Sequence, residues 1–159
     1  MSKVTVKSRF DITRMIGPEF GAEFQNRLGE TLLEEMKNDI SKGNSPVRTE
    51  RRFEPYKNPE KYPAGKKPNR PVNLHLTGEM LQYLKFKPVT GRPAVDVGYL
   101  NAPHDVQVRA IAHNTGTGDM AQRKHIPWES GDELTVRITR RMIDVYKERL
   151  ARLIQKGNK

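Results

Sequence analysis

The segment from residue 43 to residue 76 most restricts how this chain can fold. It contains six prolines, at positions 46, 55, 59, 63, 68 and 71. Proline fixes φ and lacks a backbone N–H, so these residues stiffen the segment into extended pieces. Connections inside compact domains usually span only a handful of residues. We therefore predict an extended arm over 43–76 that lies on a nucleic acid, a neighbouring subunit, or both.

The arm is also basic and contains aromatic residues. Between Arg48 and Arg70 there are eight basic and three acidic residues, so this stretch carries +5 of the formal net charge of +10. Cations interleaved with aromatic rings suit phosphate contact combined with base stacking. Alternatively, the rings anchor a solvated or subunit-contacting arm across a protein surface. The candidate interface residues are Arg48, Arg51, Arg52, Phe53, Tyr56, Lys57, Lys61, Tyr62, Lys66, Lys67 and Arg70.

Composition limits the class of protein. A chain of 159 residues suits a single domain spanning 1–159. Because only 35% of residues are hydrophobic and 30% are charged, we expect a small core that is supported by partner subunits. A pI near 9.9 is typical of chains that meet polyanions, acidic protein surfaces or anionic membranes. The absence of cysteine excludes disulfides and thiolate metal sites, and no apolar run is long enough to span a membrane.

The first long helix is predicted from a strict four-residue repeat of large apolar residues. The repeat consists of Phe20, Phe24, Leu28, Leu32, Met36 and Ile40. Since a helix has 3.6 residues per turn, each step rotates the stripe by about 40°, so it winds around the helix. Either both ends face different parts of one core, or one end packs on a neighbouring copy. Pro18 suits the first helical position, and residues 41–44 supply the stop.

After the arm, the sequence predicts a short helix and a β-hairpin. Thr77 and Gly78 precede an acidic residue, which is typical of a helix start. Apolar and polar residues alternate over 94–99 and again over 106–112, and the link between them is rich in turn residues. The two stretches are therefore predicted to pair as antiparallel strands. A weaker alternation over 4–6 predicts a short edge strand.

The last third of the chain predicts a loop and a second long helix. The glycines at 116 and 118 indicate a flexible loop over 114–127. Ser130 and Glu133 have the spacing of a capping box, so we expect the closing helix to start there. Its inward residues are predicted to be Leu134, Ile138, Met142, Val145, Leu150 and Leu153. The fold class is α+β: two long helices flanking a small antiparallel β-sheet, with a long extended basic loop between the first helix and the sheet.

No pattern in the chain predicts catalysis. The four histidines are scattered, with no helical i, i+4 pair and no Cys/His cluster. His113 is better explained as a partly buried, hydrogen-bonded side chain than as a general base. The glycines near residue 116 lack the Lys-Ser/Thr pair of a phosphate-binding loop, and no serine elbow or thiol is present. We expect no enzymatic activity, no cofactor and no metal.

The order of motifs resembles a known family. A long helix is followed by a proline-bearing loop, the Leu76–Leu81 motif, a polar-glycine turn at 113–116, the Arg123–Trp128 segment and a closing helix. This order resembles the neck and tail-completion proteins of tailed bacteriophages, related to the lambda Z protein and the Mu virion-morphogenesis protein. The positions that match the family motifs are Thr77, Gly78, His113, Thr115, Gly116, Ile126, Pro127 and Trp128.

The resemblance implies a non-enzymatic structural protein of the virion, assembled in the cytoplasm of the host bacterium. It implies a homo-oligomeric ring, six- or twelve-fold, between the portal-proximal connector and the tail, with other neck, connector and tail proteins as partners and no membrane. Double-stranded DNA would pass through such a ring without sequence-specific contact. The residues alone also allow an alternative, a nucleic-acid-binding module that acts through the basic stretch 48–70.

Overall fold

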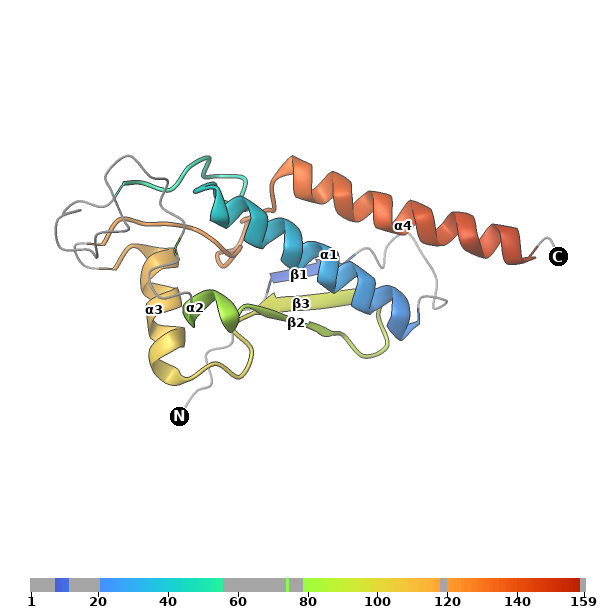
Figure 1. Ribbon diagram of the computed structural model, residues 1–159, viewed down its shortest axis with the longest axis horizontal. Coiled ribbons are helices and arrows are strands. Elements are labelled where there is room, and N and C mark those ends of the chain that lie inside the picture. The colour runs from blue at the N-terminus through green and yellow to red at the C-terminus, as the bar shows by residue number, and fades with distance from the viewer. Residues whose placement is uncertain (1–7, 12–20, 56–73, 75–78, 118–119, 158–159) are drawn as a thin grey trace.

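Four helices and three short strands make up the described part of the chain (Figure 1). The computed structural model describes residues 8–11, 21–55, 74, 79–117 and 120–157. The elements are β1 (Ser8–Asp11), α1 (Ala22–Ser41), α2 (Glu79–Gln82), β2 (Lys85–Pro88), β3 (Ala94–Gly98), α3 (His104–Thr115) and α4 (Val136–Gly157). Mixed helices and a small antiparallel sheet confirm the α+β class.

The strands form one antiparallel sheet in the order β1-β3-β2. The central strand β3 is buried along all five residues, and Val95 and Val97 have no solvent exposure. β2 and β3 form the hairpin, with Gly91 in the left-handed region at φ 73° in the turn between them. β1 is an edge strand; the edge strand predicted over 4–6 lies outside the described residues.

Helix α1 lies across the sheet and also packs against α4 (Figure 1). The predicted stripe is confirmed from Phe24 to Ile40, because its five described members are all buried in the core of the same chain. This agrees with the interpretation in which the winding stripe serves one core. Gly29 makes the close approach possible, since a Cβ there would overlap the ring of Phe86 on β2.

The prediction of a strand over 106–112 was wrong. These residues belong to α3, which ends at Gly116 in the left-handed conformation at φ 71°. Val106, Ala110 and Asn114 are its buried residues, and their four-residue spacing is helical. The alternation of valine and alanine with polar residues also fits a strand locally, so packing decided between the two. The hairpin partner of β3 is instead β2, whose two lysines and proline gave no strand signal, and β1 pairs with the other edge of β3.

The closing helix also begins later than predicted. α4 starts at Val136, and the Oγ1 of Thr135 accepts a hydrogen bond of 3.5 Å from the backbone N–H of Ile138. Thr135 thus occupies the N-cap position that the capping-box prediction gave to Ser130. Of the residues predicted to face inward, Leu150 is instead 38% exposed. The others are buried or, for Leu153, half-buried against the core.

Candidate functional site

The structure describes the first part of the predicted arm, over residues 43–55. Arg48, Arg51 and Arg52 are exposed, as expected of interface candidates, whereas Phe53 is buried in the core. Phe53 therefore anchors the arm within its own chain. Nine further candidates lie outside the described residues: Tyr56, Lys57, Lys61, Tyr62, Lys66, Lys67, Arg70, Thr77 and Gly78.

The root of the arm is held from two sides. Val47 is fully buried and forms a β-bridge with Leu134, just before α4. The guanidinium of Arg123 donates hydrogen bonds to the carbonyl oxygens of Glu54, at 3.1 Å, and Pro55, at 3.2 Å. Arg123 is itself buried at 3% exposure. The segment that resembles the family motif thus fixes the end of the described part of the arm, at Glu54 and Pro55.

A shallow groove at the arm root has mixed charge. It is lined in part by Arg48, Arg51, Arg137, Asp39 and Glu50. The guanidinium of Arg137 lies 2.7 Å from the carboxylate of Asp39, so part of the positive charge is neutralised within the chain. Such a surface suits polar contact with another protein at least as well as contact with a run of phosphates.

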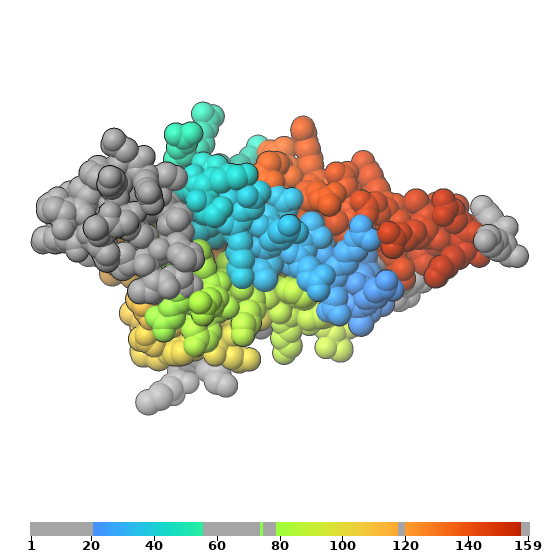
Figure 2. Space-filling model, viewed as in Figure 1, coloured from blue at the N-terminus to red at the C-terminus, as the bar shows by residue number. Residues whose placement is uncertain are grey.

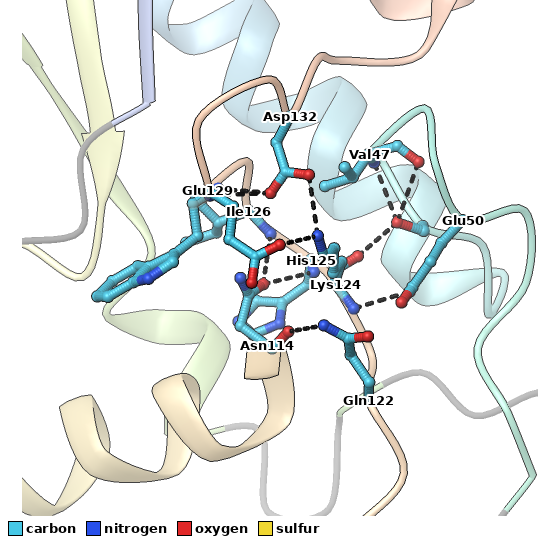
Figure 3. A network of polar contacts seen from close by, with 11 residues as sticks. Val47, Glu50, Asn114, Gln122, Lys124, His125, Ile126, Glu129 and Asp132 are labelled. Atoms are coloured by element: carbon cyan, nitrogen blue, oxygen red, sulfur yellow. Dashed lines mark hydrogen bonds and ion pairs between the residues drawn. The ribbon is translucent and has the colours of Figure 1, made fainter. Parts of the chain in front are cut away.

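Asn114 joins the end of α3 to the segment 121–128 (Figure 3). Its side-chain Oδ1 accepts hydrogen bonds from the backbone N–H groups of His125, at 2.9 Å, and Ile126, at 3.1 Å. Its backbone oxygen accepts a further bond of 3.2 Å from the side-chain amide of Gln122. Because buried N–H groups without partners are costly, this one side chain sets the course of the following segment.

Lys124 forms a second polar centre in the same region (Figure 3). Its ammonium lies 2.6 Å from a carboxylate oxygen of Glu129 and 3.0 Å from one of Asp132. These hydrogen bonds raise the pKa of Lys124. Burial opposes ionisation of Asp132, but the Glu129 N–H, the Lys124 ammonium and the Trp128 N–H outweigh it and lower its pKa. The Lys124 N–H also donates to Glu50, which ties the network to the arm root at 2.8 Å.

His125 is enclosed by these contacts and has no solvent exposure. Its Nδ1 lies 3.0 Å from the carbonyl oxygen of Arg123, and the ring meets Tyr99 edge-on at 5.7 Å between centroids. Burial lowers the pKa of His125 to about 4, and the nearby His113 adds to this effect. The imidazole is therefore neutral at physiological pH and acts as a packed structural side chain.

The residues that match the family motifs, where the structure describes them, lie together between the end of α3 and the segment 121–128. Ile126 and Pro127 are buried, whereas His113 and Trp128 are half-buried. Thr115 belongs to the last turn of α3, so the start of the loop predicted over 114–127 is helical. The clustering was not evident from the sequence, where two motifs are separated by an intervening glycine-rich stretch. Sequence reasoning also missed the role of Asn114, whose side chain joins the two motifs.

A separate surface feature is an exposed apolar stripe along α4. Its members and their exposed fractions are Val136 at 46%, Ile143 at 39%, Leu150 at 38% and Ile154 at 63%. Intervals of seven, seven and four residues place them on one side of the helix. Arg140 and Lys147 lie between them and are also exposed. Sequence reasoning missed this stripe, although its heptad spacing was available as a signal.

Comparisons with models of protein families, with curated proteins and with solved structures found no match. Within the described residues, no helix has the length and hydrophobicity needed to cross a membrane. The same residues contain no cluster of three or more His, Asp or Glu side chains suited to a metal ion.

Proposed function

We propose that this chain is a structural subunit of a tailed-phage virion, forming a neck or tail-completion ring between the portal connector and the tail. The observation that carries the proposal is the exposed apolar stripe of α4. The order of motifs along the sequence, described above, supports the family within which this surface is interpreted.

The stripe has the character of an assembly surface. Single exposed apolar residues are ordinary, but apolar side chains that gather along one helix face are typical of protein interfaces. The last turns of α4 extend beyond the end of α1 (Figures 1 and 2), and Leu150 and Ile154 are exposed in the C-terminal half of α4. A partner could cover this face without displacing any described core residue.

The basic charge fits a ring that surrounds DNA. Arg51 and Arg52 are exposed at the arm root, and neither forms an ion pair with another described residue. Cations that line a channel attract phosphates without reading the sequence, and the attraction must stay weak enough for DNA to slide. The buried polar contacts of Arg123 and Lys124 anchor the residues on either side of these two arginines.

The proposal is tested in a phage that encodes the chain. Removing the chain should yield filled heads and complete tails that fail to join, visible as separate particles by negative-stain electron microscopy. Adding the purified chain to such a lysate should restore joined particles and infectivity. Joined, infectious particles in the absence of the chain would contradict a neck or tail-completion role.

A second candidate function is a dedicated nucleic-acid-binding module, which the two exposed arm-root arginines favour. A dedicated binder should lose affinity steeply with salt, and R51S/R52S should reduce the salt slope by about 2 because two phosphate contacts are lost. The matched control is R48S, since Arg48 already pairs with Glu133 at 2.8 Å. Weak duplex binding that is insensitive to R51S/R52S would leave the ring subunit as the better explanation.

A further inference from the structure

The outer face of α1 is mainly acidic, with one half-buried lysine, Lys37, near its C-terminal end. Glu23, Glu30 and Glu34 are all exposed on the side of the helix opposite its buried stripe. None of the three forms an ion pair with another described residue. Some other acidic residues are used internally: Glu35, for example, pairs with Arg137. Three carboxylates on one helix face are therefore available to a partner.

The outer face of α4 is apolar and mainly basic, with one exposed carboxylate, Asp144, a turn away from Arg140. Arg140 and Lys147 lie within the apolar stripe that includes Ile143 and Leu150. Neither cation forms an ion pair with another described residue. α1 and α4 run along the same face of the molecule in Figure 2, so both outer surfaces are accessible together.

The two faces match each other in spacing as well as in charge. Arg140 and Lys147 are seven residues apart, Glu23 and Glu30 are also seven residues apart, and Glu34 follows Glu30 by about one turn on the same face. Seven residues correspond to about 10.5 Å of helix, so both ion pairs can form when the helices lie side by side at a shallow angle. The half-buried Leu33 and the aliphatic stems of the glutamates offer apolar surface to Ile143 and Leu150.

Two copies of the same helix face repel each other, whereas the α4 face and the α1 face attract each other. Two α4 faces would bring cations together, and two α1 faces would bring carboxylates together. Contact between α4 of one copy and α1 of the next avoids both repulsions. Such a contact is heterologous, because each copy uses a different surface toward each neighbour. Repeated around an axis, a heterologous contact forms a ring when the rotation between successive copies closes, and an open filament when it does not.

We propose that the basic, apolar face of α4 docks on the acidic outer face of α1 from a second copy of this chain. This inference rests on the proposed function, because it supplies the contact between successive subunits of the ring. The ion pairs set the partner and the register, and the apolar residues between them provide most of the buried area.

Charge reversal tests the contact on the full chain. R140E/K147E makes the α4 face acidic, and E30K/E34K makes the α1 face basic. Glu23 is left unchanged because it lies beside a cavity lined by Arg27, Arg149 and Arg152, where lysine would repel its own chain. The matched control is K85E/K87E, which makes the same charge change as R140E/K147E on two exposed residues of β2.

The Kd for self-association should rise by about tenfold or more in each reversal variant, as measured by sedimentation velocity. K85E/K87E should associate like the wild-type chain. An equal mixture of R140E/K147E and E30K/E34K should recover association, because each variant then meets complementary faces. The fourfold variant that carries both reversals should associate by itself. Thermal unfolding should be unchanged throughout, since all four side chains are exposed.

Two results would overturn the inference. One is association of E30K/E34K alone at wild-type strength, which would remove α1 as the partner face. The other is a wild-type chain that stays monomeric at its highest soluble concentration. The phage experiment is separate: if the variants still join heads to tails, the contact is wrong but the function stands. If rings form as described while deletion leaves joining intact, the function is wrong but the contact stands.

Discussion

At the scale of single residues, His125 shows how the chain uses a titratable group for packing. Its ring is fully buried, and its Nε2 has no hydrogen-bond partner among the described residues. Protonating that nitrogen would place a buried charge without a hydrogen-bond partner next to the ring of Tyr99. The folded state therefore holds the neutral form, whereas the unfolded chain protonates near the ordinary pKa.

This difference predicts how stability depends on pH. The pKa of His125 is lowered from 6.5 to about 4, so below pH 6.5 the unfolded state binds more protons than the folded state. The contribution of His125 is fully present above pH 6.5 and is lost as the pH falls toward 4. The expected total loss is about 3 kcal/mol, measured by urea unfolding at successive pH values.

Two variants separate this effect from other titrations. His125→Gln should lower stability at neutral pH but flatten the dependence between pH 6.5 and pH 4, because the titrating group is gone. His104→Gln, at an exposed position at the start of α3, is the matched control for the loss of a histidine. An equally steep dependence in His125→Gln would show that other groups cause it.

At the scale of elements, the crossing of α1 over the sheet depends on one glycine. Gly29 faces the ring of Phe86, and the absence of a side chain lets the helix backbone approach β2 directly. Helix propensity alone would favour alanine at this position by about 1 kcal/mol. The contact with Phe86 therefore outweighs the intrinsic preference of the backbone.

Gly29→Ala should lower the free energy of unfolding by at least about 1 kcal/mol net, because overpacking costs more than the gain in helix propensity. The measurement is chemical denaturation. Asn26→Ala, at an exposed position of the same helix, should change stability by less than about 0.5 kcal/mol. In the Phe86→Leu background, Gly29→Ala should cost less, and a cost equal to that in the wild-type chain would contradict the packing argument.

At the scale of the whole molecule, the apolar residues of α4 have two roles: some are buried in the core and others are exposed. Ile138, Met142 and Val145 complete the core with α1. Ile143 and Ile154 face outward, where they contribute little to the stability of the isolated chain. One helix therefore serves both the fold of the subunit and, in the proposed ring, the contact with the next copy.

Substitutions at two neighbouring positions of α4 distinguish core packing from self-association. Ile154→Ser should change the free energy of unfolding by less than about 0.5 kcal/mol, because the side chain is 63% exposed, and yet weaken self-association. Leu153→Ser should lower the stability of the subunit, because Leu153 packs against the core. Denaturation and sedimentation velocity measure the two effects, and unchanged association of Ile154→Ser would remove this residue from the interface.

The sequence by itself determined those elements whose hydrophobic pattern fits only one type of secondary structure. The four-residue stripe from Phe24 to Ile40 is too long for a strand and too regular for a loop, so it specified α1 and its buried face. The inward residues Ile138, Met142 and Val145 of α4 followed in the same way. A chain with these helices and some β signal could be placed in the α+β class without its tertiary structure.

Only the tertiary structure decided what local patterns leave open. The alternation over 106–112 fits a strand or a helix, and packing selected the helix α3. No local rule brings Asn114 to the backbone of His125, or Arg123 to the arm root, because these hydrogen bonds join distant segments. Likewise, the heptad spacing on α4 was present in the sequence, but the structure decided which of its apolar residues stay exposed. Periodicity defines the faces of an element, whereas the partner of each face depends on the whole chain.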